Sequence, residues 1–223
     1  MHKTKTALAV EALREAILHG HIKPGERLNV DVLSRELQMS RTPIREAVRI
    51  LEAEGWIKNE PHRKVTVADL SADDAREVYL LRAHLEGLAT QLAVERLSDD
   101  DVRALRALQD RMIEAHRVGD HESLRRGNTD WHYYLYRASG TKYLLEFILR
   151  LWVPFPWDAV WEIPGRGAKS LQQHEAILEA VAARDAERAG RLMYEHILSG
   201  KTSVQQYLEQ GAIAAAPAKE ASG

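Results

Sequence analysis

Three arginines recur at every fourth position of one short segment. The segment is SRTPIREAVRIL, residues 40–51, and its arginines are Arg41, Arg45 and Arg49. On a helix these side chains form one basic stripe, and an apolar stripe lies roughly 110° away from it. The apolar stripe consists of Ile44, Ala47, Val48 and Leu51. A helix held by one face, with guanidinium groups on the next, suits the major groove of DNA, where arginine binds guanine edges or phosphate. A surface helix with solvated arginines is the alternative.

Four residues in the second half of the chain are of types that ligate metals. Asn128 and His132 are at i and i+4, so they project from one face of a helix. His174 and His196 lie in two later helical segments. Three imidazoles and one carbonyl oxygen suit a divalent metal such as Zn²⁺, Ni²⁺ or Mn²⁺. The chain has 10 histidines and only one pair of candidate ligands is local, so histidines satisfied in the core or at the surface are the alternative.

Two helical segments precede the arginine-rich one. An apolar face runs from Val10 to Ile17 on the first, and Pro24–Gly25 then prevents a helix from continuing. Asn29 or Asp31 can cap the second, VDVLSREL, which is followed by a tight turn. Helix, turn and basic helix in this order are the helix-turn-helix pattern.

Ser40 is expected to cap the start of the arginine-rich helix. A basic hairpin is expected after this helix. Residues 56–59 and 65–67 look like two short strands, and the turn PHRK, residues 61–64, joins them. Such a hairpin is a wing that can reach the DNA backbone or minor groove; alternatively, it only closes the small core. Either way, the sequence predicts a winged helix-turn-helix domain over residues 1–68.

The remainder of the chain has long helical periodicity and almost no glycine, which predicts an all-α bundle over residues 69–210 and hence a mainly α protein. The expected helices are 72–96, 99–118, 121–138, 141–153, 168–183 and 185–209. The Trp- and Pro-rich segment 152–165 is an apolar flap, a subunit interface or plain packing. Residues 211–223 are expected to be a disordered tail.

Composition restricts the class of protein. Residues 1–68 carry a net charge of +3 (12 Lys and Arg, 9 Asp and Glu) and the rest −5 (19 against 24), as in a nucleic-acid module joined to another domain. The absence of cysteine excludes disulfides and thiolate metal sites. No apolar run approaches the ~18 residues of a membrane span, so a cytoplasmic protein without membrane contact is expected.

The order of motifs resembles the GntR superfamily of bacterial transcription regulators. The segments that carry the resemblance are LREAILHGHIKPGERL and LSRELQMSRTPIREAVRILEAEGWI. The resemblance implies that seven residues contact operator DNA: Ser40, Arg41, Thr42, Arg45 and Arg49, with His62 and Arg63 in the wing.

Residues 72–200 resemble the FCD effector-binding domain of the FadR-like subgroup. The resemblance lies in LLRAHLEGLATQLAVERL, NTDWHYYLYRASG and HEAILEAVAARDAERAGRLMYEHI. It implies a helical bundle that holds a divalent metal through Asn128, His132, His174 and His196. Relatives often have Asp where Asn128 stands, so this site carries one negative charge fewer. The resemblance also makes Arg82 the clamp for a carboxylate effector, whereas a surface ion pair with Glu86 is its structural alternative.

Together these features predict a ligand-responsive transcription repressor that acts as a homodimer on a short palindrome. A small carboxylate effector would bind the metal and Arg82 and alter operator affinity. The chain is not expected to be an enzyme. The alternatives are a metal-dependent hydrolase or lyase that uses the histidine cluster, with Glu175 as the only obvious general base, and an adaptor whose winged helix binds protein.

Overall fold

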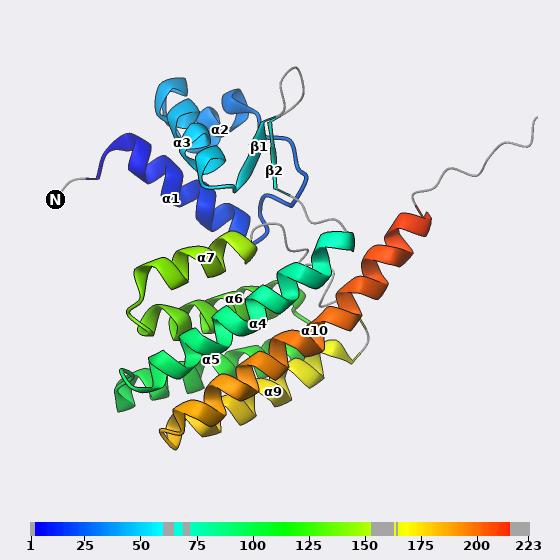
Figure 1. Cartoon of the computed structure of the whole chain (residues 1–223). Coiled ribbons are helices and arrows are strands. Elements are labelled where there is room, and N and C mark those ends of the chain that lie inside the picture. The colour runs from blue at the N-terminus through cyan, green and yellow to red at the C-terminus, as the bar shows by residue number, and fades with distance from the viewer. Residues whose placement is uncertain (1–2, 60–64, 69–71, 153–162, 164, 215–223) are drawn as a thin grey trace, which may run out of the picture.

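The computed structural model describes residues 3–59, 65–68, 72–152, 163 and 165–214, without the side chains of 72–75 and 202–214. A small N-terminal unit is followed by a bundle of long helices (Figure 1). The N-terminal elements are α1 (Lys5–Leu18), α2 (Val30–Glu36), α3 (Arg41–Ala53), β1 (Ile57–Asn59) and β2 (Val65–Val67). The bundle consists of α4 (Ala72–Val94), α5 (Asp99–Val118), α6 (His121–Ala138), α7 (Lys142–Trp152), α9 (Arg166–Ala182) and α10 (Ala186–Ala214).

The N-terminal unit is a winged helix, as predicted. Strands β1 and β2 pair antiparallel, with Ile57 opposite Val67. Arg27, in the extended segment after α1, forms an isolated bridge with Thr66 and so adds to the sheet a pairing that the sequence did not predict. Helices α1 and α3 enclose a core in which Leu13, Ile44 and Leu51 are almost fully buried.

The bundle has a separate core that is built around large side chains. Trp131 and Tyr136 of α6 and Trp152 of α7 are fully buried, together with aliphatic residues of α5, α9 and α10. Leu18 of α1 and Leu149 of α7 pack against the cores of both units. Figure 1 accordingly shows α1 and α7 close together at the junction between the winged helix and the bundle. Among the described residues, no helix is long and apolar enough to cross a membrane.

Helices α4 and α10 lie against each other along their length (Figure 1). Two glycines permit this close packing, because a Cβ added to Gly87 would lie only 2.9 Å from the carbonyl oxygen of Gly190. A Cβ at Gly190 would meet the carbonyl oxygen of Gly87 at the same distance. The contact brings α10, which carries His196, against α4, which carries Arg82.

The predicted helices agree with the observed ones to within a few residues, except that α10 continues to Ala214 beyond the predicted end at 209. Asn29 rather than Asp31 caps α2, because its side chain accepts from the backbone N–H groups of Asp31 and Val32. Ser40 occupies the N-cap position of α3 but makes no capping hydrogen bond, contrary to expectation. Most of the Trp- and Pro-rich segment lies outside the described residues.

Replacement of Gly87 by leucine is expected to lower the free energy of unfolding by about 1–3 kcal/mol, because the side chain would collide with the backbone of α10. The matched control is Arg76→Leu, which adds the same side chain to an exposed position of α4. Urea denaturation followed by circular dichroism measures both changes. A Gly87→Leu protein as stable as the control would contradict the close helix contact.

Candidate metal centre and DNA interface

The helix α3 has the two stripes that its sequence predicts. Its apolar residues are buried against the winged-helix core: Pro43, Ile44, Ala47, Val48 and Leu51. Its polar and basic residues are exposed: Arg41, Thr42, Arg45 and Arg49, with Ser40 just before the helix. The exposed row leaves the guanidinium groups accessible to a DNA groove. His62 and Arg63, the predicted wing contacts, lie outside the described residues.

Arg41 is already engaged within the protein. Its Nε lies 2.8 Å from Oδ1 of Asp31 in α2, and both side chains are more than half exposed. Because the pair is exposed, it contributes little to stability. It does place a carboxylate next to the first arginine of the stripe.

Three predicted metal ligands converge in the bundle. Nε2 of His174 lies 3.1 Å from Nε2 of His132 and 3.2 Å from Nε2 of His196. The rings come from α9, α6 and α10, and all are buried. Their candidate ligand atoms lie within 4.8 Å of one another, so the three residues form a group that could hold a metal ion.

Burial keeps the three imidazoles neutral. It lowers the pKa of His174 to about 3, and the Arg166 guanidinium adds to this effect. The pKa values of His132 and His196 also lie well below the ordinary value, first through burial and then through neighbouring rings and arginines. Neutral imidazole is the form that ligates a metal.

Hydrogen bonds on the outer side of two rings determine where their protons lie. The hydroxyl of Tyr136 donates to Oε2 of Glu86 at 2.5 Å, so its oxygen accepts the proton on Nδ1 of His132 at 2.8 Å. The side-chain oxygen of Gln173 accepts from Nδ1 of His196 at 3.0 Å. Both rings therefore direct the lone pair of Nε2 towards the shared centre.

A cation fits this arrangement better than protons do. A single proton on Nε2 of His174 can satisfy only one of the two lone pairs that face it, whereas one divalent metal would accept all three nitrogens. Trp131 stacks on His174 with 4.4 Å between ring centroids and so restrains the plane of this ring. Nδ1 of His174 has no hydrogen-bond partner among the described residues.

Asn128 is buried one helical turn before His132 on α6, which is the face predicted for a fourth ligand. Coordination by Asn128 remains a prediction. Sequence reasoning did not identify Tyr136 or Gln173 as residues that orient the rings. Their positions offered a signal, since Tyr136 is at i+4 from His132 and Gln173 immediately precedes His174.

Arg82 makes the ion pair with Glu86 that the sequence offered as an alternative, but the pair is buried rather than at the surface. Nε of Arg82 lies 2.7 Å from Oε1 of Glu86, and the exposed fractions of the two side chains are 3% and 0%. Nε1 of Trp152 donates to the same Oε1 at 2.9 Å. The hydroxyl of Tyr136 is the third donor, so the Glu86 carboxylate is surrounded by donors that come from three helices, α4, α6 and α7.

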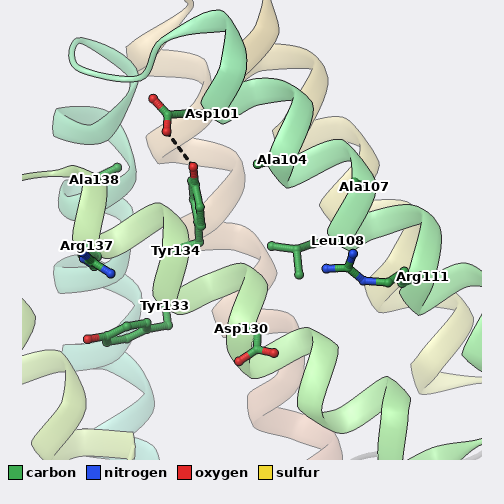
Figure 2. A pocket seen from close by; sticks show the side chains of 10 residues that line it. All are labelled: Asp101, Ala104, Ala107, Leu108, Arg111, Asp130, Tyr133, Tyr134, Arg137 and Ala138. Atoms are coloured by element: carbon green, nitrogen blue, oxygen red, sulfur yellow. Dashed lines mark hydrogen bonds between the residues drawn. The ribbon is translucent and has the colours of Figure 1, made fainter.

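The opposite face of α6 contacts solvent and the winged helix. A groove between α5 and α6 is lined by Asp101, Asp130 and Tyr133, among others (Figure 2). In Figure 2, Tyr134 points at Asp101, to which its hydroxyl donates at 2.6 Å. The hydrogen bond from the Ser98 side chain, followed by that from Tyr134, lowers the pKa of Asp101 to about 2.

Asp130 also connects α6 to the winged helix. Its Oδ1 lies 3.2 Å from Nε2 of His19, the residue that caps the end of α1, and this hydrogen bond raises the pKa of His19. Asp130 and Tyr133 line a cavity of about 300 Å³ whose other walls include Trp56 and Arg14. A single helix therefore presents candidate metal ligands on one face and contacts to the winged helix on the other.

A winged helix with an exposed basic helix, joined to an all-α bundle, defines a class of DNA-binding regulators. Comparison with known families agrees with this class. Residues 5–67 match the family described as bacterial regulatory proteins, gntR family, and residues 77–199 match the FCD domain. The chain belongs to the GntR family of transcription regulators, in its FadR-like group with an FCD domain.

The relatives have similar lengths and bear regulator names. YdhC of Bacillus subtilis, an HTH-type transcriptional regulator, is 27% identical over 89% of this chain and 90% of its own. The regulator McbR of Escherichia coli is 29% identical over 83% and 86%, and the repressor GlaR of the same species is 27% identical over 87% and 93%. The solved structure of E. coli McbR superposes with a TM-score of 0.81 over 92% of this chain and 100% of McbR, at 27% identity.

Replacement of Glu86 by glutamine is expected to lower the free energy of unfolding by about 3–5 kcal/mol, because Arg82 would remain buried without its counter-charge. Glu146→Gln is the matched control, since Glu146 pairs with Arg150 at the same spacing on the exposed side of α7. The control is expected to unfold like the wild type in urea. Equal stability of both variants would mean that the buried pair is not needed.

Proposed function

We propose that this transcription regulator is a repressor controlled by a small carboxylate, which binds in the FCD domain at a divalent-metal site and changes the affinity for operator DNA. The convergence of three neutral imidazoles in the bundle core is the observation that carries the proposal. The name of the relative GlaR supports the repressor role.

His132, His174 and His196 would hold the metal, with Asn128 as the fourth ligand. Zn²⁺, Ni²⁺ and Mn²⁺ are all compatible with such a nitrogen-rich set. When bound, the metal supplies open Lewis-acid positions that a carboxylate oxygen can occupy. Arg82, which is fixed by Glu86 at the side of the cluster, is proposed to attract the same carboxylate.

A homodimer would place two α3 helices on the half-sites of a palindromic operator. The exposed leucines of α4 support self-association. Leu81 and Leu88 are at i and i+7 on one face, and their exposed fractions are 44% and 47%. Arg41, Thr42, Arg45 and Arg49, with Ser40 at the helix start, are proposed to contact the DNA.

The helix α6 provides a direct physical connection between the two functions. Effector binding at His132 would shift α6, and its outer face touches the end of α1 through Asp130 and His19. The effector alters DNA affinity only to the extent that it binds one placement of the winged helices better than the other.

The alternative of a metal-dependent hydrolase requires a general base near the cluster. Glu175, the candidate that the sequence offered, makes an ion pair with Arg106 of α5. Family and relatives agree with regulation.

Arg45→Ala is expected to abolish specific operator binding, because a lost base contact costs about 1–3 kcal/mol in each half-site. The operator would first be selected from random DNA with the wild-type protein, and affinities would be measured by fluorescence anisotropy. Arg103→Ala, which removes an exposed arginine of α5, is the matched control. Unchanged operator affinity of Arg45→Ala, at unchanged melting temperature, would refute its assignment to the interface.

Small carboxylates are expected to raise the melting temperature of the metal-loaded protein and to lose this effect after chelation. His174→Ala should abolish the effect as well, because it removes the central ligand of the cluster. His116→Ala, an exposed histidine of α5, is the control. If neither chelation nor His174→Ala changes the rise in melting temperature that any acid causes, the histidines are structural and the proposed metal site is refuted.

A further inference from the structure

Two buried arginines, Arg82 and Arg166, lie near Tyr79 and the histidine cluster. The guanidinium carbon of Arg82 lies 5.3 Å from the centroid of the Tyr79 ring. Arg166, the first residue of α9, and the hydroxyl of Tyr79 both lie beside Gly200. A Cβ added to Gly200 would be 3.1 Å from Nη2 of Arg166 and 3.2 Å from that hydroxyl oxygen. The charges of both arginines reach His132 and His196 and contribute to the low pKa values of these rings.

The two arginines differ in how their charge is balanced. Arg82 has the buried carboxylate of Glu86 at 2.7 Å. Arg166 has no ion pair among the described residues, although only 7% of it is exposed. Its Nη1 makes long hydrogen bonds of 3.4 Å to Gln173 and 3.3 Å to Ser199, and its Nε has no partner.

An unbalanced guanidinium in the interior is unfavourable, because it has lost water without gaining a counter-charge. Burial and the charge of Arg82 accordingly lower the pKa of Arg166. Among the described residues, with neutral histidines and a neutralised Arg82–Glu86 pair, the positive charge of Arg166 has no carboxylate to balance it. A metal at the cluster would add two more.

The position of Arg166 relates it to the cluster. Gln173 accepts from Arg166 on one side and from Nδ1 of His196 on the other, so Arg166 is two hydrogen bonds away from a candidate ligand. One carboxylate group cannot reach both the shared centre of the Nε2 atoms and a guanidinium beyond the far edge of an imidazole. A ligand that engages both therefore needs a second acidic group.

We propose that Arg166 is a second anion-binding residue of the effector site, and that the effector is a dicarboxylate with one acidic group at the metal and the other on Arg166. This inference rests on the proposed carboxylate-effector function and specifies its ligand class. The second acidic group would supply the counter-charge that Arg166 lacks among the described residues, which makes binding sensitive to the number of acidic groups.

The first test uses the metal-free, full-length protein. Arg166→Met is expected to raise the melting temperature by a few degrees, because it removes an unbalanced buried charge. Arg82→Met, the matched control, is expected to lower it, because Glu86 then loses its partner. A fall for Arg166→Met like that for Arg82→Met would overturn the proposal, since Arg166 would then be balanced already.

The second test measures binding to the Ni²⁺-loaded protein by calorimetry. Malonate, succinate and glutarate are compared with propionate, butyrate and valerate, the monocarboxylates of equal length. At least one dicarboxylate is expected to bind about 10-fold more tightly than its monocarboxylate, and Arg166→Met should abolish this preference while Arg166→Lys retains part of it.

The outcomes separate the two proposals. Dicarboxylates that bind Arg166→Met as tightly as the wild type would overturn the role of Arg166 and leave the carboxylate effector intact. Monocarboxylates that bind the wild type as tightly as dicarboxylates would overturn the ligand class. If no acid binds the metal-loaded wild type, both proposals fall together.

Discussion

One buried carboxylate, that of Glu86, holds together the helices around the histidine cluster. It accepts hydrogen bonds from Arg82 of α4, Tyr136 of α6 and Trp152 of α7. A buried charge is tolerated only while such donors replace its water, so the three helices must keep their relative positions. The orientation of His132 follows from this constraint, because the hydroxyl that donates to Glu86 also accepts from the imidazole.

The helix α6 unites the features that a ligand-controlled regulator needs. Its inner face carries His132 and the buried Asn128, and its outer face carries Asp130, which bonds to His19 beside the winged helix. Because a packed helix moves as a unit, an event on one face is felt on the other. The GntR and FCD parts of the chain therefore meet through α6 as well as through the contact of Leu18 and Leu149 with both cores.

Local signals explain what the sequence predicted and what it missed. The helix over 99–118 was predicted with correct ends because Ser98, which forms a capping box, marks its start and Gly119, in the left-handed conformation, marks its end. The stripes of α3 followed from helical periodicity alone. Burial of Glu86 could not be predicted, since it depends on side chains that α6 and α7 contribute. Arg166 had no recognisable pattern in the sequence, because only the fold brings it next to Ser199 of α10.

On the proposed role of Arg41 in DNA contact, its ion pair with Asp31 would affect how the winged helix searches DNA. Affinity for random sequence comes mostly from phosphates that the protein neutralises. Because Asp31 already balances Arg41, the start of α3 would offer less charge to an arbitrary phosphate, and random sites would be released sooner. The Asp31 carboxylate acts as an internal mimic of the DNA backbone. A DNA site would engage Arg41 only where its phosphates or bases compete successfully with Asp31, so the pair would favour selective over random binding.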